Sequence, residues 1–167
     1  MADHSDVIPE LEGIEELEFD EAFHKKLCGM LDRVPLLREF EYSELQTLAH
    51  YCHVYKAAQG SLIFREGQPG NIMYLLVDGY VALIKGEKQL GTVREGKTMG
   101  EMSMLDNKPY SATAISGVES TFIVFDRKEF GRLMNEQAPI ALKLLIAIST
   151  LLSTRLRETT DLLVDRL

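Results

Sequence analysis

The segment from Gly100 to Thr113, GEMSMLDNKPYSAT, holds the residue types in this chain that best suit the binding of a small anion. A short helix that begins near Gly100 would direct its N-terminal N–H groups and its positive dipole end at such a ligand. The small side chains of Ser111 and Ala112 would let the backbone approach it closely. The segment therefore predicts an anion-binding loop. The alternative is a helical turn and loop that only connect two strands.

The same residues resemble the phosphate-binding cassette of cyclic-nucleotide-binding domains, which occur in bacterial catabolite-activator regulators and in regulatory subunits of cAMP-dependent protein kinase. The family pattern is Gly-Glu-x-small-Leu, followed by Arg-small-Ala before a strand. The departure that matters is at the arginine, where Tyr110 stands. The resemblance implies that Glu101 accepts a hydrogen bond from a ribose hydroxyl. It implies a set of ligand contacts at Gly100, Glu101, Met102, Ser103, Tyr110, Ser111 and Ala112.

Tyr110 changes what the cassette can offer a phosphate. A tyrosine donates one neutral hydrogen bond, whereas arginine supplies a bidentate, charged contact. Hydrogen bonds to charged groups contribute about 1.5–3 kcal/mol, and neutral ones about half of that. We therefore expect a cyclic nucleotide to bind about tenfold more weakly or worse, unless Lys97, Lys108 or Arg155 compensates.

Two further segments extend the resemblance to about residues 35–160. The run from Gly60 to Val81 is similar to the first half of the family's β-roll. Near the end, Arg155-Leu156-Arg157-Glu158-Thr159-Thr160 is similar to the final-helix motif with which catabolite activators reach a purine. The resemblance implies ligand contacts by Arg155, Thr159 and Thr160. Water or the helix's own carbonyls are the other partners open to the two hydroxyls.

The pattern of the chain predicts a mainly β fold, a jelly roll of the cyclic-nucleotide-binding type with flanking helices. Residues 20–33 and a helix capped by Ser43 form the first helices, within 20–52. Short apolar runs separated by glycines predict the roll over 53–126, with Asp78-Gly79 as a tight hairpin turn. Helices follow over 127–167, so that 20–167 form one domain.

The last helix is expected to be long. Asp126 caps a helix over 127–137, and Pro139 lies in the first turn of the next. Its apolar seam predicts pairing with a second copy, rather than packing on its own roll alone. We expect the dimer interface at Leu145, Leu152, Leu156 and Leu163.

Negative charge is concentrated in the first part of the chain. Residues 1–21 contain nine acids and no Lys or Arg, whereas the remainder holds 17 acids and 18 bases. This balance disfavours nucleic acid as a partner. We interpret residues 1–19 as a solvated tail; a docking segment or short amphipathic helix is the alternative.

The sequence favours a cytoplasmic protein. It has no run of 18 apolar residues and no signal-peptide pattern, so we expect no membrane span. The two cysteines, Cys28 and Cys52, fit a reduced compartment, although one bridge is not excluded.

Other candidate chemistry is weak. His50, Cys52 and His53 are close in sequence but lack the pattern of a zinc site, so we interpret them as packing or surface residues. Nucleophile and carboxylate pairs typical of hydrolases are not identifiable, and we expect no enzyme activity, metal or cofactor.

These observations favour a bacterial, stand-alone sensor or adaptor that binds a cyclic nucleotide, cAMP first, and signals through an effector protein. The sequence ends where a regulator's helix-turn-helix would begin, so we expect no DNA-binding domain. The alternatives are a ligand-free dimeric scaffold, a cyclic-dinucleotide receptor, and a regulatory fragment of a larger protein.

Overall fold

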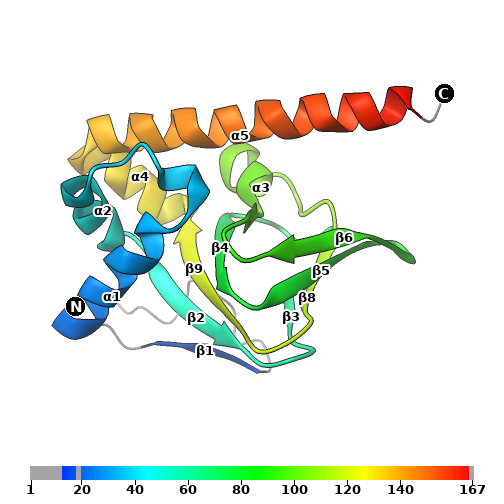
Figure 1. Cartoon of the computed structure of the whole chain (residues 1–167), viewed down its shortest axis with the longest axis horizontal. Helices are drawn as coiled ribbons and strands as arrows, with labels where there is room; N and C mark the ends of the chain where they lie inside the picture. The colour runs from blue at the N-terminus through cyan, green and yellow to red at the C-terminus, as the bar shows by residue number, and fades with distance from the viewer. Residues whose placement is uncertain (1–12, 18–19, 166–167) are drawn as a thin grey trace.

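Two antiparallel sheets form a roll, and helices pack at one end of it (Figure 1). The computed structural model describes residues 13–17 and 20–165. One sheet has the order β1–β2–β9–β4–β7 and the other β3–β8–β5–β6. The fold class predicted from the sequence is confirmed. The strands are β1 (Ile14–Glu16), β2 (His53–Ala57), β3 (Leu62–Phe64), β4 (Ile72–Asp78), β5 (Tyr80–Lys85), β6 (Lys88–Arg94), β7 (Thr98–Met99), β8 (Thr113–Ser116) and β9 (Ser120–Asp126).

The helices flank this roll at both ends of the chain and inside the cassette. Asp20 caps the first helix by accepting a hydrogen bond from the backbone N–H of Phe23, and Asp126 caps the fourth in the same way. Both caps satisfy an N–H that has no partner within the helix. The helices are α1 (Glu21–Asp32), the 3₁₀ turn η1 (Pro35–Leu37), α2 (Tyr42–Ala49), α3 (Glu101–Asp106), α4 (Arg127–Glu136) and α5 (Ala138–Val164).

Two expectations about local structure were wrong. Asp78-Gly79 does not close a hairpin, because β4 pairs with β7 and β9 whereas β5 pairs with β6 and β8. Gly79, at φ 92°, instead carries the chain from one sheet into the other. The second helix begins two residues earlier than expected: Glu41, not Ser43, is its cap, in a reciprocal box with Glu44.

The acidic segment contributes a strand. Residues Ile14–Glu16 pair with β2, with Ile14 opposite Ala57 and Glu16 opposite Tyr55. Glu16 also accepts hydrogen bonds from Tyr55 and contacts His53 at 2.8 Å. The expectation of a solvated tail is therefore wrong for residues 14–16. Residues 1–12 and 18–19 lie outside the described part of the chain.

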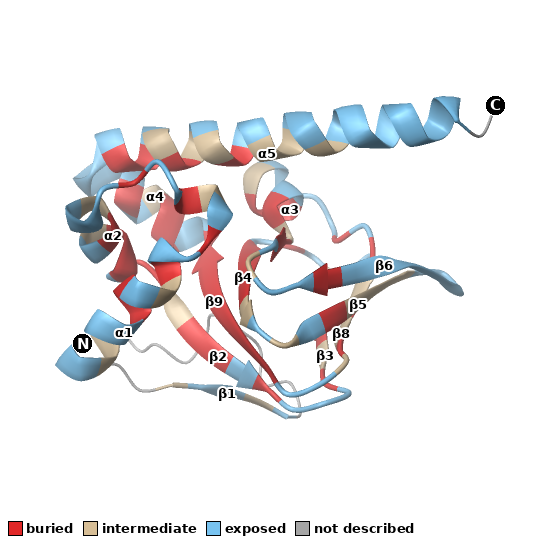
Figure 2. Ribbon diagram, in the orientation of Figure 1, coloured by how far each residue is buried: buried red, intermediate tan, exposed pale blue. Residues whose placement is uncertain are grey.

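Helix α5 is buried on one side only. Ile140, Ala141, Leu144 and Ile148 pack into the core formed with the other helices, and the second half of the helix extends beyond it (Figure 2). By length and composition, α5 meets the criterion for a membrane-crossing helix, with a mean hydropathy of 1.5. This is weak evidence, because core helices pass the same test.

Candidate functional site

The cassette segment forms the predicted short helix between two strands. Gly100 follows β7 and is the N-terminal cap residue of α3, with its backbone in the left-handed region at φ 79°. A side chain at Gly100 would place its Cβ 2.5 Å from the carbonyl oxygen of Ile72. Glycine is therefore required here both by backbone conformation and by space. It lets α3 begin directly against β4.

A cavity of about 670 Å³ lies between the cassette, the sheet that contains β5 and β6, and the second half of α5. This volume lies within the range of small-molecule sites. The structure brings together nine of the ten ligand contacts expected from the sequence, and Thr160 is the one that does not line the cavity. The nine are Gly100, Glu101, Met102, Ser103, Tyr110, Ser111, Ala112, Arg155 and Thr159.

Glu101 connects the cavity with α5. Its Oε1 forms an ion pair with the guanidinium of Arg155, which also donates to the backbone carbonyl of Thr98 at 2.9 Å. The Glu101 side chain is 5% exposed and the Arg155 side chain 36%. The second carboxylate oxygen of Glu101, Oε2, is buried and has no hydrogen-bond partner among the described residues. A buried acceptor of this kind is costly unless a ligand or water donates to it.

Tyr110 does not present its hydroxyl to the cavity. The hydroxyl donates to the carbonyl oxygen of Ile72 at 3.2 Å and accepts from the Ile72 N–H at 3.3 Å. Its ring stacks on Phe64 with centroids 4.1 Å apart. Burial raises the pKa of Tyr110, so the phenol is neutral at physiological pH. The expectation that Tyr110 offers a hydrogen bond in place of the arginine is therefore wrong, because the backbone of β4 already uses that hydroxyl.

The cations that were expected to compensate differ in position. Lys97 and Arg155 line the cavity, whereas Lys108 is not among its lining residues. Lys85, which the sequence did not single out, donates to the carbonyl of Ser111 at 2.8 Å and pairs with Glu66 at 3.2 Å. Arg155 is already engaged by Glu101. Among the described residues, Lys97 is thus the lining cation outside that ion pair.

The threonine hydroxyls of α5 bond to their own helix. Thr159 donates to the carbonyl of Arg155 at 2.8 Å, and Thr160 to that of Leu156 at 2.9 Å. The alternative that the helix's own carbonyls satisfy these hydroxyls is therefore what the structure shows. Thr159 still lines the cavity, and a ligand can contact it there by an exchange of this bond.

Sequence reasoning missed most of the apolar wall of the cavity. Most of these residues come from β3, β5, β6 and the end of α5, whereas Met99 of β7 directly precedes the cassette. The apolar residues of β5 and β6 indicate strands but not which of their side chains face a ligand. The missed apolar lining residues are Phe64, Leu83, Leu90, Val93, Met99 and Leu162, and the missed polar ones are Thr92, Thr98 and Glu158.

The four leucines expected at a dimer interface divide into two pairs. Leu145 and Leu152 are partly buried and pack against the chain's own core. Leu156 and Leu163 are 68% and 60% exposed. Leu145 and Leu152 thus take part in docking α5 on the chain's own core, and the dimer interface stays a prediction.

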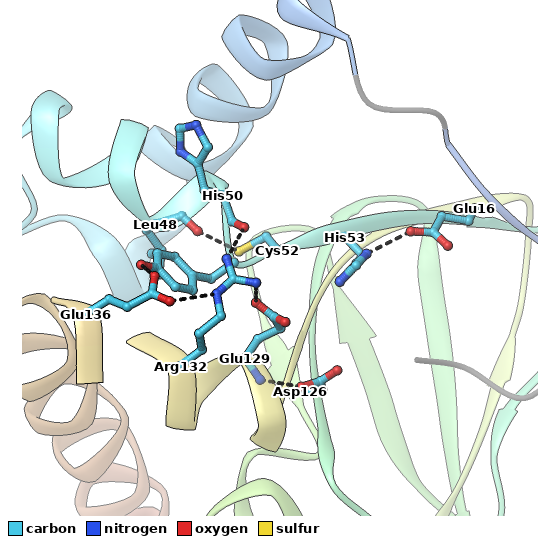
Figure 3. Close-up of polar contacts among 10 residues, drawn as sticks. Glu16, Leu48, His50, Cys52, His53, Asp126, Glu129, Arg132 and Glu136 are labelled. Atoms are coloured by element: carbon cyan, nitrogen blue, oxygen red, sulfur yellow. Dashed lines mark hydrogen bonds and ion pairs between the residues drawn. The ribbon is translucent and has the colours of Figure 1, made fainter. Parts of the chain in front are cut away.

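His50, Cys52 and His53 have separate partners and do not converge (Figure 3). His50 contacts the carbonyl of Gln46 at 2.8 Å, and His53 contacts Glu16. Burial raises the pKa of the Cys52 thiol, which donates to the carbonyl of Leu48. No cluster of metal-ligating side chains is found in residues 13–17 and 20–165. Both cysteines, Cys28 and Cys52, are free and buried.

Arg132 joins α4 to the turn after α2 (Figure 3). It donates to the carbonyl of His50 at 3.1 Å, pairs with Glu129 and Glu136, and lies 4.4 Å from the ring centroid of Tyr51. The Tyr51 hydroxyl donates to Glu136 at 2.6 Å, which raises the pKa of Tyr51. This network holds the helices that support the start of α5.

Comparison with known proteins places these features in a family. Residues 55–137 match the family described as "Cyclic nucleotide-binding domain". A cAMP-dependent protein kinase regulatory subunit of Hypocrea atroviridis is 31% identical over 106 residues, 64% of this chain and 23% of the relative. The chain spans 16–29% of the length of curated relatives among the cAMP- and cGMP-dependent protein kinase proteins that it matches.

Solved structures agree with this match. A cyclic nucleotide-binding domain from Methylobacillus flagellatus KT has a TM-score of 0.81 and 26% identity, with 93% of this chain and 90% of that chain covered. The cAMP-bound structure of PfPKA-R has a TM-score of 0.63 and 26% identity, with coverage of 75% and 47%.

Proposed function

Because this chain belongs to the cyclic nucleotide-binding domain family, we propose that it is a non-enzymatic sensor whose cavity binds a ribose-containing ligand and whose α5 reports that binding to a partner protein. The observation that carries the proposal is the position of Glu101. One oxygen of this carboxylate holds Arg155 of α5, and the other is a buried acceptor without a partner. A ligand hydroxyl that donates to Oε2 would therefore act on the group that docks α5.

The proposed movement of α5 requires that the ligand binds one arrangement of the helix more tightly than the other. A ligand bound between the cassette and α5 contacts both, so it binds best when α5 is docked through Arg155. It can shift α5 between docked and released arrangements only to the extent that its affinity differs between them. The second half of α5 is the part free to change, since the residues buried in the core lie in the first half.

Cyclic AMP is the first nucleotide to test, because the cited relative and PfPKA-R are both named for cAMP. A ligand-free scaffold remains the competing function, and the position of Tyr110 favours it over strong phosphate binding.

We also propose that the distal part of α5 is the surface through which ligand binding is signalled, and that a second copy of this chain pairs there. Leu156, Leu162, Leu163 and Val164 are each more than half exposed, on the part of α5 that lies past the helical core (Figure 2). An effector protein that recognises this helix, in a cytoplasmic setting, completes the proposed role. The ion pair at Arg155 lies just before these residues and can control their position.

The test is calorimetric titration of the full chain with adenosine, cAMP, cGMP and cyclic di-GMP, combined with hydrogen exchange along α5. We expect one ribose-containing ligand to bind and to increase protection of residues 151–164. Glu101→Gln should weaken that binding, whereas Glu87→Gln, outside the cavity, is the matched control. Absence of binding by all four would establish the scaffold instead.

A further inference from the structure

Among residues 13–17 and 20–165, the charged side chains that line the cavity have a net charge of zero. They are the carboxylates of Glu101 and Glu158 and the cations of Lys97 and Arg155. Arg155 is neutralised by Glu101. An anionic ligand would therefore meet one cation outside that pair, Lys97, together with the opposing charge of Glu158. A cavity with this balance gives an anion little net attraction over water.

The part of the cassette where the family places its arginine is apolar and neutral. Tyr110 occupies it with its ring against Phe64, and its hydroxyl is held by both backbone groups of Ile72. Reorienting the phenol toward a phosphate would leave those two buried backbone groups without a partner, each at a cost of about 1–3 kcal/mol. A phosphate beside this pair would lose hydration without gaining a charged donor.

The remaining features suit a neutral ligand with hydroxyl donors and a flat ring. The Glu101 Oε2 atom, on a side chain 5% exposed, needs a donor. Leu83, Leu90 and Leu162 line the same cavity with apolar side chains from three elements, β5, β6 and α5. A ribose diol can donate a hydrogen bond to Glu101 Oε2, and an uncharged base can pack against the leucines.

We propose that the cavity selects an uncharged ribonucleoside over the corresponding cyclic nucleotide. The inference rests on the proposed function, because it assumes that this cavity is the ligand site, and it deepens it by naming the ligand class. Tyr110 acts as the specificity-determining residue: it fills the position of the phosphate-binding cation and leaves the contact with Glu101 intact.

The experiment compares adenosine with cAMP, and guanosine with cGMP, by calorimetry on the full wild-type chain. We expect at least one nucleoside to bind about tenfold or more tightly than its cyclic nucleotide, the ratio that one charged hydrogen bond represents. The 2′-deoxynucleoside should bind several-fold more weakly, since it lacks a hydroxyl for Glu101. Tyr110→Arg should reverse the preference, and Tyr110→Phe, which keeps the stack on Phe64, should retain it.

The outcomes separate the two proposals. If the wild-type chain binds the cyclic nucleotide as tightly as the nucleoside or more tightly, the selectivity inference is overturned while the ligand site stands. If neither class binds, the proposed function fails and the inference fails with it. The wild-type ratio alone decides the inference, so a Tyr110→Arg protein that does not fold would not prevent the test.

Discussion

Replacing Arg155 by Met should destabilise the protein by much more than an ordinary surface substitution. The change leaves Glu101 buried with both carboxylate oxygens unpaired, and it removes the 2.9 Å bond to the Thr98 carbonyl. Breaking a fully buried ion pair costs about 3–5 kcal/mol. Since 36% of the Arg155 side chain is exposed, water replaces part of the lost interaction. We therefore expect a loss of about 2–3 kcal/mol.

Urea unfolding followed by circular dichroism measures this loss, which corresponds to a fall in Tm of about 5–10 °C for a chain of this size. Arg157→Met is the matched control, because Arg157 lies two residues away on the exposed part of α5. Glu101→Gln in the Arg155→Met background should recover part of the stability, because it removes the buried charge. If Arg155→Met costs no more than Arg157→Met, the ion pair does not hold α5 and the proposed signalling route is refuted.

Three further outcomes are expected. The hydrogen bond from Lys143 to Glu44 at 2.6 Å lowers the pKa of Glu44, so Lys143→Met should cost about 0.5–1 kcal/mol at pH 7. The loss of stability should become smaller as the pH falls below about 4, because Glu44 is then protonated and no longer pairs with Lys143. Urea unfolding of both proteins at pH 7 and at a pH below about 4 measures this, and a loss that is the same at the two pH values would contradict the ion pair. Gly100→Ala should lower the free energy of unfolding by about 2 kcal/mol or more, because φ is 79° and the new Cβ meets a β4 carbonyl; a change below 0.5 kcal/mol on thermal melting would rule this out. Leu156→Glu should convert a sedimenting dimer to a monomer, whereas Met134→Glu on α4 should not; a monomeric wild type at micromolar concentration would remove the dimer proposal.

The fold was largely predictable because its signals are local. Asp20 and Asp126 cap their helices through short-range hydrogen bonds, and Pro139 lies in the first turn of α5 as expected. The passage of the chain from one sheet to the other at Asp78-Gly79, where a hairpin was expected, was not predictable in this way. A turn dipeptide reports backbone conformation, which Gly79 has, but not which strands pair on either side of it.

The candidate site was predictable in its cassette and not in its partners. The resemblance to the family's cassette marked Gly100 and Glu101, and the turn and helix start at this point are local features of the sequence. The ion pair between Glu101 and Arg155 joins residues 54 positions apart, and only the docking of α5 brings them together. The use of the Tyr110 hydroxyl by Ile72 likewise depends on β4, which lies 38 residues earlier.

The pairing of β1 with β2 fixes the position of the chain at residue 13, where the described part begins. Residue 13 lies at an outer edge of the five-stranded sheet, whereas α5 runs along the opposite side of the molecule (Figure 1). Whatever binds the residues before Gly13 therefore starts from a point remote from the distal part of α5. A partner with a basic site for the acidic segment and an apolar site for α5 would engage both at once. Each contact would then raise the effective concentration of the other, and release of α5 alone would weaken the complex by a large factor without dissolving it.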